Sequence, residues 1–307
     1  MTFNEHLHLK GYSSKSIMTI EKIVSYFKQW CNQENIADET EVNHNDIIAY
    51  IKSCTAKGVT QKTTANYVSH IKKYYDYLIK EKGIPDNPCS YINIKGIKRK
   101  VVYDIIPFEA LESLYHLYRT DTGNKKQQLI RKRNKAMLGL LIYQGLQSEE
   151  LIKLEIQDLQ LRDGKIRIHA GRRSAGRNMK LEASQAFELI DYLNDTRKSL
   201  LQQAERTAQE ETALFITSEK GVRVGSNTIS TLLKQIRKIN SKTGGEHSRT
   251  ITSINQIRAS VIVHWLKLYH LRKVQHLAGH KYISSTERYQ SSNLEDLKED
   301  ISKYHPF

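Results

Sequence analysis

The C-terminal part of the chain reads Asn255-Gln256-Ile257-Arg258, then Leu277-Ala278-Gly279-His280, then Thr286-Glu287-Arg288-Tyr289. The pattern of apolar residues across residues 254–289 predicts that these three segments belong to helices or to the turns between them. Tyr289 lies nine residues after His280, and Arg258 precedes both. Each segment alone is a weak signal, because a Gly-His pair is common and the chain has 17 tyrosines. A function can therefore be inferred from these three segments only together with further segments of the chain.

Two further segments lie upstream. One reads Gly145-Leu146-Gln147-Ser148-Glu149-Glu150-Leu151. The other alternates polar and apolar residues over 164–169, turns at 171–177 and returns through Met179 and Leu181. Such alternation is typical of half-buried strands, so we expect a small antiparallel β-hairpin here.

Together these five segments resemble the sequence boxes of the tyrosine recombinase (phage integrase) family. In that family the last boxes read H-x-L-R and L-G-H, and the nucleophilic tyrosine follows that histidine at the spacing found here. The segment from Gly145 is similar to the box T-G-L-R-x-S-E-L, and the turn at Gly171 is similar to a G-K-G hairpin. Five boxes in the right order extend the resemblance over nearly the whole chain, although the N-terminal third matches only in type.

The resemblance implies a reaction without ATP, metal or other cofactor, because the phosphodiester energy is kept in a covalent bond. Tyr289 would attack a DNA phosphodiester, form a 3′-phosphotyrosyl link and free a 5′ hydroxyl, which then attacks the partner strand. Extra negative charge develops on the phosphate, and donors fixed around its oxygens stabilise that charge. Arg258 offers a planar, bidentate fork for this purpose. His280 and Asn255 are expected to bind the same phosphate.

Three of the six catalytic positions of the family carry other residues here. Gln147 stands where the family has its first arginine, Arg172 where it has lysine, and Asn255 where it has histidine. Gln147 offers an N–H without charge, and the loss of one such charged donor costs on the order of 10² in rate. Arg172 keeps a positive charge but does not readily release a proton, so Lys180 on the returning strand is a second candidate for the leaving oxygen. Asn255 cannot act as an acid or base near neutral pH.

Two functions remain open at this point. The chain is either a working site-specific recombinase with an altered active site, or a DNA-binding relative with little catalysis that acts as the partner subunit of an active enzyme. A basic RNA-binding protein is a third reading, but the sequence has no RNP-type or KH motif.

Length and composition agree with a DNA-binding protein of two domains. The chain has 307 residues, with 48 Lys and Arg against 33 Asp and Glu, which gives a net charge of +15. A surplus of this size indicates a polyanionic partner, and double-stranded DNA is the first candidate.

No apolar run approaches the ~20 residues that span a bilayer, so no membrane partner is expected. Three cysteines without CxxC spacing indicate neither disulfides nor zinc, and we expect a bacterial cytoplasmic, nucleoid-associated protein.

The expected fold is mainly helical with a small antiparallel hairpin or sheet, and its two domains are expected to form a C-shaped clamp around DNA. Residues 1–83 are predicted to be a helical core-binding (SAM-like) domain, 84–105 a basic linker and 106–307 the catalytic domain. A short amphipathic helix at Leu294–Ile301 would either dock on a neighbouring protomer, in a homo-oligomer such as a tetramer, or pack on its own domain. An accessory or partner recombinase is also possible.

Basic residues outside the catalytic set are expected to contact the DNA backbone. A tyrosine-rich helix is predicted near residue 70, and its alternative role is to pack its tyrosines in the core instead of contacting phosphates. For the hairpin, the alternative is that its charged side chains are merely solvated. The candidates are Lys72, Lys73, Lys95, Lys98, Arg99, Lys100, Arg173 and Arg177.

Overall fold

The computed structural model describes residues 1–95, 104–172, 174–205, 211–240 and 251–290. It divides into two compact units, Met1–Arg99 and Lys100–Phe307, and each is considered by itself. The predicted mainly helical fold with a small antiparallel sheet is confirmed. Within the described ranges, no helix is both long enough and apolar enough to cross a membrane.

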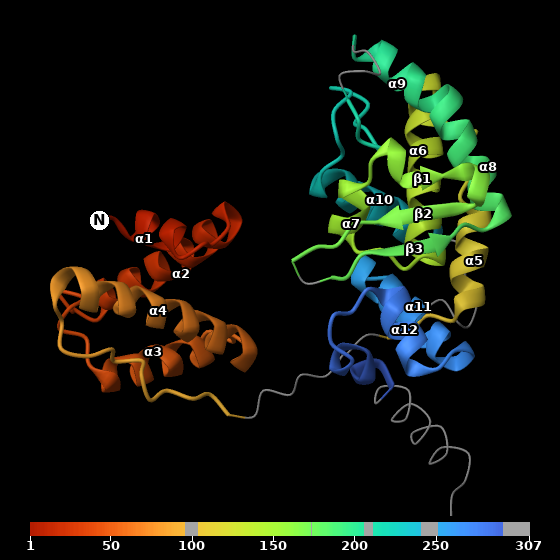
Figure 1. The fold of residues 1–307 in the computed structure, drawn as a ribbon. Coiled ribbons are helices and arrows are strands. Elements are labelled where there is room, and N and C mark those ends of the chain that lie inside the picture. The colour runs from red at the N-terminus through yellow and green to blue at the C-terminus, as the bar shows by residue number, and fades with distance from the viewer. Residues whose placement is uncertain (96–103, 173, 206–210, 241–250, 291–307) are drawn as a thin grey trace, which may run out of the picture. The chain divides into compact units, whose positions relative to one another are not determined.

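The described part of the first unit is a bundle of four helices (Figure 1). They are α1 (Phe3–Leu9), α2 (Ser14–Gln33), α3 (His44–Ala56) and α4 (Gln61–Lys82). Each begins after a residue whose side chain accepts a hydrogen bond from the first helical turn, which satisfies one of the backbone N–H groups exposed there. These capping residues are Thr2, Ser13, Asn43 and Thr60.

Aromatic side chains fill the centre of this bundle. The ring of Phe27 packs edge-on against Tyr50 and Tyr75, and Tyr75 is fully buried. Tyr74, the neighbouring residue on α4, is only 4% exposed. Tyr74 and Tyr75 are therefore core residues of this unit.

Part of the stretch expected as a linker packs onto the first unit. Asn87 donates from Nδ2 to the carbonyl of Lys72 at 2.9 Å and to Asp76 Oδ1 at 2.7 Å, and its Oδ1 accepts the N–H of Cys89. Cys89 is completely buried. Residues 84–94 therefore lie against α4, whereas the basic residues Lys98, Arg99 and Lys100 lie outside the described residues.

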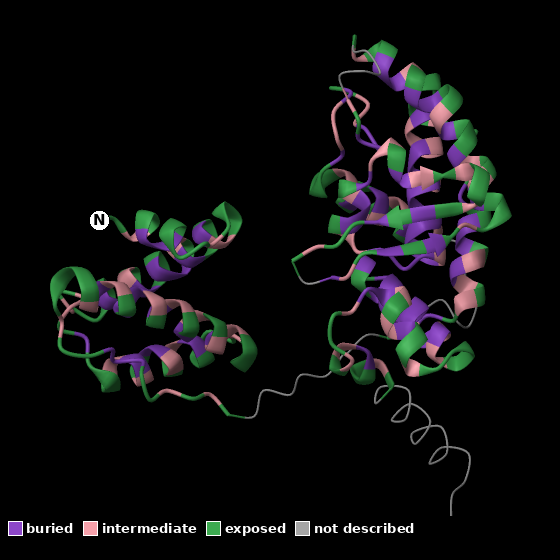
Figure 2. Ribbon diagram, in the orientation of Figure 1, coloured by how far each residue is buried: buried purple, intermediate pink, exposed green. Residues whose placement is uncertain are grey.

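The second unit is built around two buried helices, α6 (Lys125–Tyr143) and α11 (Ile254–Leu268). Residues 136–142 of α6 and 256–263 of α11 are all buried, and Figure 2 shows purple on the visible part of α11. Helix α11 packs against α6, α5 and α12, and residues 284–290 form a further helical turn. Among the described residues, this unit also contains the α-helices α5 (Phe108–Leu117), α7 (Ser148–Lys153), α8 (Ala183–Asp191), α9 (Arg197–Gln203), α10 (Ser226–Asn240) and α12 (Leu271–Ala278).

The predicted hairpin is confirmed, and a third strand extends it. The strands β1 (Leu159–Gln160), β2 (Lys165–Ile168) and β3 (Arg177–Lys180) pair antiparallel in that order. In β3 the residues alternate between the two faces of the sheet, as strand geometry requires. Arg177 and Met179 are buried, whereas Lys180 is exposed.

The segment around residues 214–216 forms only isolated bridges at its two ends. Ala213 pairs with Glu155, and Ile216 pairs with Arg223. The N–H of Leu214 donates to the carbonyl of Leu154 at 2.9 Å, and the backbone then turns back at once. This segment is therefore too short for a ladder and serves to join the end of α7 to the loop before α10.

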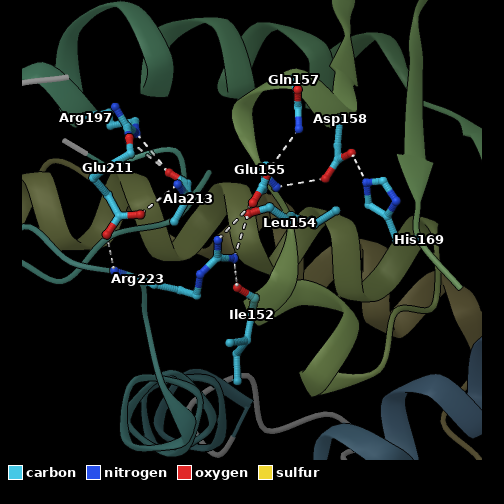
Figure 3. A network of polar contacts seen from close by, with 10 residues as sticks. All are labelled: Ile152, Leu154, Glu155, Gln157, Asp158, His169, Arg197, Glu211, Ala213 and Arg223. Atoms are coloured by element: carbon cyan, nitrogen blue, oxygen red, sulfur yellow. Dashed lines mark hydrogen bonds and ion pairs between the residues drawn. The ribbon is translucent and has the colours of Figure 1, made fainter. Parts of the chain in front are cut away.

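A polar network fixes the end of α7 (Figure 3). Arg223 donates from Nη1 to the carbonyl of Ile152 at 2.9 Å and from Nη2 to Glu155 Oε1 at 3.3 Å. The N–H of Glu155 donates to Asp158, whose other oxygen lies 2.6 Å from His169 Nε2. Because unpaired carbonyls at the end of a helix need partners, these bonds hold α7 against its neighbours.

Candidate active site

The three residues that match the family pattern lie together in the second unit. Arg258 comes from α11, His280 follows α12, and Tyr289 lies on the helical turn 284–290. The rings of His280 and Tyr289 are stacked, with centroids 5.9 Å apart and planes inclined by 12°. Arg258 Nη2 lies 3.5 Å from His280 Nε2. A guanidinium, an imidazole and a phenol thus share one site.

Arg258 is buried and held by backbone carbonyls. Its Nη1 donates to the carbonyl of Gly145 and its Nη2 to that of Ala278. Burial lowers the pKa of this guanidinium, while the nearby carboxylate of Glu150 acts in the opposite direction. Two carbonyls from different segments fix the plane of the fork, so the direction of its remaining N–H groups is set by the fold.

His280 is neutral in this environment. Burial, followed by the charges of Arg258 and Arg177, lowers its pKa to about 4. Arginine has only donors, so the contact with Arg258 makes His280 Nε2 the acceptor. The ring proton then lies on Nδ1, which is 2.9 Å from Thr286 Oγ1. The lone pair of Nε2 therefore faces the site.

Glu150, which was not among the predicted site residues, contacts two arginines of this site. Arg177 donates to both oxygens of its carboxylate, at 2.8 and 3.1 Å, and Arg258 Nη1 lies 3.8 Å from Oε2. The backbone N–H of Gln147 donates to the same oxygen at 2.9 Å. Burial raises the pKa of Glu150, but the hydrogen bonds and charge of Arg177 outweigh it and keep the pKa below its usual value. We call Glu150, Arg177 and Arg258 the guanidinium cluster.

Gly279 allows the guanidinium cluster to approach the end of α12. Its φ of +66° ends the helix in the left-handed conformation, which glycine adopts without strain. A Cβ at this position would overlap Arg177 Nη1 and lie 3.0 Å from Arg177 Cζ. The carbonyl of Gly279 accepts the N–H of Ala175 at 2.9 Å, so the tip of the hairpin lies against this turn.

We expect Gly279→Ala to lower the free energy of unfolding of the second unit by about 2 kcal/mol, because left-handed strain costs ~1–2 kcal/mol and the clash with Arg177 adds to it. Thermal unfolding measures this. The control is Gly164→Ala, since Gly164 also has a positive φ (+59°) but nothing lies within 4 Å of its would-be Cβ. Equal shifts for the two variants would contradict the close approach of Arg177.

The other predicted catalytic residues lie at the start of α7, at the start of α11, at the hairpin tip and on β3. Gln147 is half-buried at the start of α7, and Asn255 is exposed at the start of α11, one turn before Arg258. Arg172 is exposed at the hairpin tip, where its carbonyl accepts a hydrogen bond from Lys281 Nζ at 3.0 Å. Lys180 lies on the exposed face of β3, opposite to the face that carries Arg177.

The predicted DNA-binding residues lie in different environments. Lys72 and Lys95 are exposed, and Lys73 is half-buried on α4, where burial lowers its pKa. Arg177 is buried on Glu150 rather than placed on the surface. The remaining candidates lie outside the described residues: Lys98, Arg99, Lys100 and Arg173.

The chain is similar to bacterial recombinases along its full length. It is 26% identical over 306 residues to the tyrosine recombinase XerC of Bacillus pumilus, with 99% of this chain and 95% of the relative covered. It is 27% identical over 299 residues to the tyrosine recombinase XerD of Oceanobacillus iheyensis, with 97% and 94% covered.

Solved structures share the fold. XerH site-specific recombinase bound to difH substrate in a pre-cleavage complex aligns with a TM-score of 0.69 at 19% identity, covering 94% of this chain and 82% of that one. A lambda integrase dimer bound to a COC′ core site aligns with a TM-score of 0.66 at 14% identity, covering 94% and 92%.

Two family models match successive parts of the sequence. The model of the phage integrase N-terminal SAM-like domain matches residues 2–82. The model of the phage integrase family matches residues 105–295, which include the guanidinium cluster, His280 and Tyr289. The chain therefore belongs to the phage integrase family.

Proposed function

We propose that this protein is a site-specific tyrosine recombinase that cleaves and rejoins DNA strands through a covalent bond to Tyr289. The observation that carries the proposal is the meeting of Arg258, His280 and Tyr289 in one site, from three separate elements of the second unit. The names of the relatives, tyrosine recombinases XerC and XerD, support the same reaction. An inactive DNA-binding relative would have no need to keep this arrangement.

The proposed step balances as a transesterification. The Tyr289 oxygen attacks phosphorus, the bond from phosphorus to the 5′ oxygen breaks, and a 3′-phosphotyrosyl link forms. The phenolic proton passes to a water molecule, because His280 Nε2 accepts a hydrogen bond from Arg258 and Asn255 has no group that titrates near neutral pH. A water molecule returns a proton to the 5′ oxygen, because Lys180 lies on the outer face of β3 and the Arg172 guanidinium does not readily release one. Arg258 stabilises the charge that develops on the phosphate.

Duplex DNA is the proposed substrate and partner. The net charge of +15 supports it, and the structural neighbours include a lambda integrase dimer on its core site and XerH on difH. Two DNA strands must exchange at one place, so we infer a homo-oligomer on DNA, a tetramer in its complete form, with a partner recombinase as the alternative. The proposed place is the bacterial cytoplasm, at the nucleoid.

Binding to duplex DNA is expected to weaken strongly with salt. Each phosphate neutralised by lysine or arginine releases counterions, so log K falls by about 0.9 per phosphate for each tenfold rise in salt. Electrophoretic mobility shifts over a series of KCl concentrations measure the slope. We expect a slope steeper than about −4, and a slope near zero would contradict binding along the DNA backbone.

A covalent trapping experiment tests the proposed reaction. The probe is a pool of duplexes with a randomised central sequence and a nick, so that cleavage releases a short strand and leaves the protein attached. The protein is denatured and captured, and the DNA that remains bound is sequenced. We expect adducts enriched in one sequence, and no adduct at high protein concentration would favour the inactive DNA-binding alternative.

A further inference from the structure

Two contacts join the helical turn that carries Tyr289 to His280. Thr286 Oγ1 lies 2.9 Å from His280 Nδ1, and the ring of Tyr289 is stacked on the same imidazole. We propose that Thr286 is a positioning residue, whose hydroxyl holds the turn 284–290 and the imidazole in the arrangement from which Tyr289 attacks. This inference rests on the proposed function and adds a residue to the same site.

The spacing of Thr286 and Tyr289 places both side chains toward His280. Residues three apart in a helix lie on the same side of it, and both contacts are made with one imidazole. Backbone hydrogen bonds begin this turn, because the N–H groups of Thr286 and Glu287 donate to the carbonyl of Ile283 at 2.7 and 3.0 Å. A hydrogen bond at 286 therefore fixes the start of the turn that carries the phenol.

The hydrogen bond of Thr286 supplies a restraint that stacking does not. Stacked rings can slide over each other and turn about the axis through their centres, because their attraction depends only weakly on these movements. A hydrogen bond at Nδ1 stops the imidazole from turning. The opposite nitrogen, Nε2, lies 3.5 Å from Arg258 Nη2, so one bond sets both the face turned to Tyr289 and the edge turned to Arg258.

A buried hydroxyl suits this position. Thr286 is fully buried, so a broken bond to His280 would not readily be replaced by a bond to water. A hydroxyl can accept from an imidazole N–H or donate to a bare ring nitrogen, so the bond survives a change of tautomer. A carboxylate at this position would favour the charged imidazolium instead, whereas the pKa of His280 is lowered to about 4 and the ring is neutral.

The test compares Thr286→Val with Thr286→Ser. Valine keeps the shape of threonine without the hydroxyl, and serine keeps the hydroxyl without the methyl group. The readout is the single-turnover rate of covalent adduct formation at saturating nicked duplex, selected from the randomised pool. We expect Thr286→Val to lower this rate about tenfold, as the loss of one buried hydrogen bond predicts, and Thr286→Ser to stay within about threefold of the wild type. DNA binding should change by less than about twofold in both variants.

Thr196→Val is the matched control. Thr196 is also fully buried in the second unit, but its Oγ1 has no hydrogen-bond partner among the described residues. The same exchange of hydroxyl for methyl there should leave the rate of adduct formation at the wild-type value. A slower Thr196→Val protein would show that the exchange acts through packing alone, which would overturn the inference drawn from Thr286→Val.

Two further measurements separate positioning from a general loss of structure. In NMR spectra of the imidazole nitrogens, the signal absent from His280→Gln belongs to His280, and we expect Thr286→Val to shift the Nδ1 resonance of that residue and leave the other histidines unchanged. In the His280→Gln background, Thr286→Val should lower the rate by less than about threefold, because two residues that act through each other are not additive.

Four outcomes would overturn the inference. They are a wild-type rate for Thr286→Val, equal losses in Thr286→Val and Thr286→Ser, an unchanged His280 signal, and the full loss from Thr286→Val in the His280→Gln background. If Thr286→Val does not fold, Thr286→Ala is compared with Thr286→Ser, because both lack the methyl group and only serine keeps the hydroxyl. Alanine must then be the slower of the two.

These measurements also separate the inference from the proposed function. A wild type that forms no adduct overturns the proposed function itself, and the NMR spectra still test the bond between Thr286 and His280. Adducts formed equally fast by the wild type and Thr286→Val overturn only the role of Thr286.

Discussion

Tyr289→Phe is expected to abolish the covalent adduct with nicked DNA. The substitution removes only the phenolic oxygen, which is the attacking atom of the proposed step, and no other group in the site can take its place. Binding of duplex DNA should change by less than about twofold, because the ring is kept and the backbone contacts dominate affinity. Denaturing gels measure the adduct, and mobility shifts measure binding.

The matched control for this experiment is Tyr282→Phe. Tyr282 belongs to the same C-terminal region but is 74% exposed, whereas Tyr289 is stacked on His280. The control should form the adduct at the wild-type rate. An adduct formed by Tyr289→Phe would assign the attack to another residue, and an adduct lost in both variants would indicate a general loss of structure.

The sequence predicted the elements that have a strong local signal. The apolar pattern across residues 254–289 predicted the helices found there, and polar–apolar alternation predicted the hairpin. The three boxes at the C-terminus predicted which residues lie together, because the family pattern fixes their order. Residues Arg258, His280 and Tyr289 do share one site.

The environment of Arg177 was not predicted, although a signal for it existed. Met179 and Leu181 were recognised as apolar, and in a strand every second residue lies on the same face. That alternation places Arg177 on the inner face and Lys180 on the outer one, as observed. An arginine at an inner position indicates a buried acidic partner, and the partner, Glu150, lies on a helix 27 residues away.

The first part of the expected linker shows a limit of composition-based reasoning. Glycine and prolines at residues 83–88 correctly mark the end of α4, since Gly83 ends it with a φ of +66°. The glycine and prolines do not predict which surface the following residues pack against. Burial of Cys89 and the hydrogen bonds of Asn87 depend on acceptors on α4, which no local pattern reveals.

Arg258→Lys is expected to lower the rate of adduct formation on the order of 10²–10³, with Tm lowered by only a few degrees. Lysine keeps the charge, but one ammonium cannot span the carbonyls of Gly145 and Ala278 while donating to a phosphate. The loss should therefore appear in the chemical step, measured in single turnover at saturating DNA, more than in binding.

Arg223→Lys provides the matched control for Arg258→Lys. Arg223 also donates to two backbone carbonyls, those of Ile152 and Leu154, but it belongs to the network at the end of α7 rather than to the guanidinium cluster. If its replacement lowered the rate as much as Arg258→Lys does, loss of carbonyl anchoring alone would explain both effects. If only Arg258→Lys slows cleavage, the guanidinium of Arg258 stabilises the transition state directly, since a rigid fork on fixed carbonyls is what a preorganised phosphate site requires.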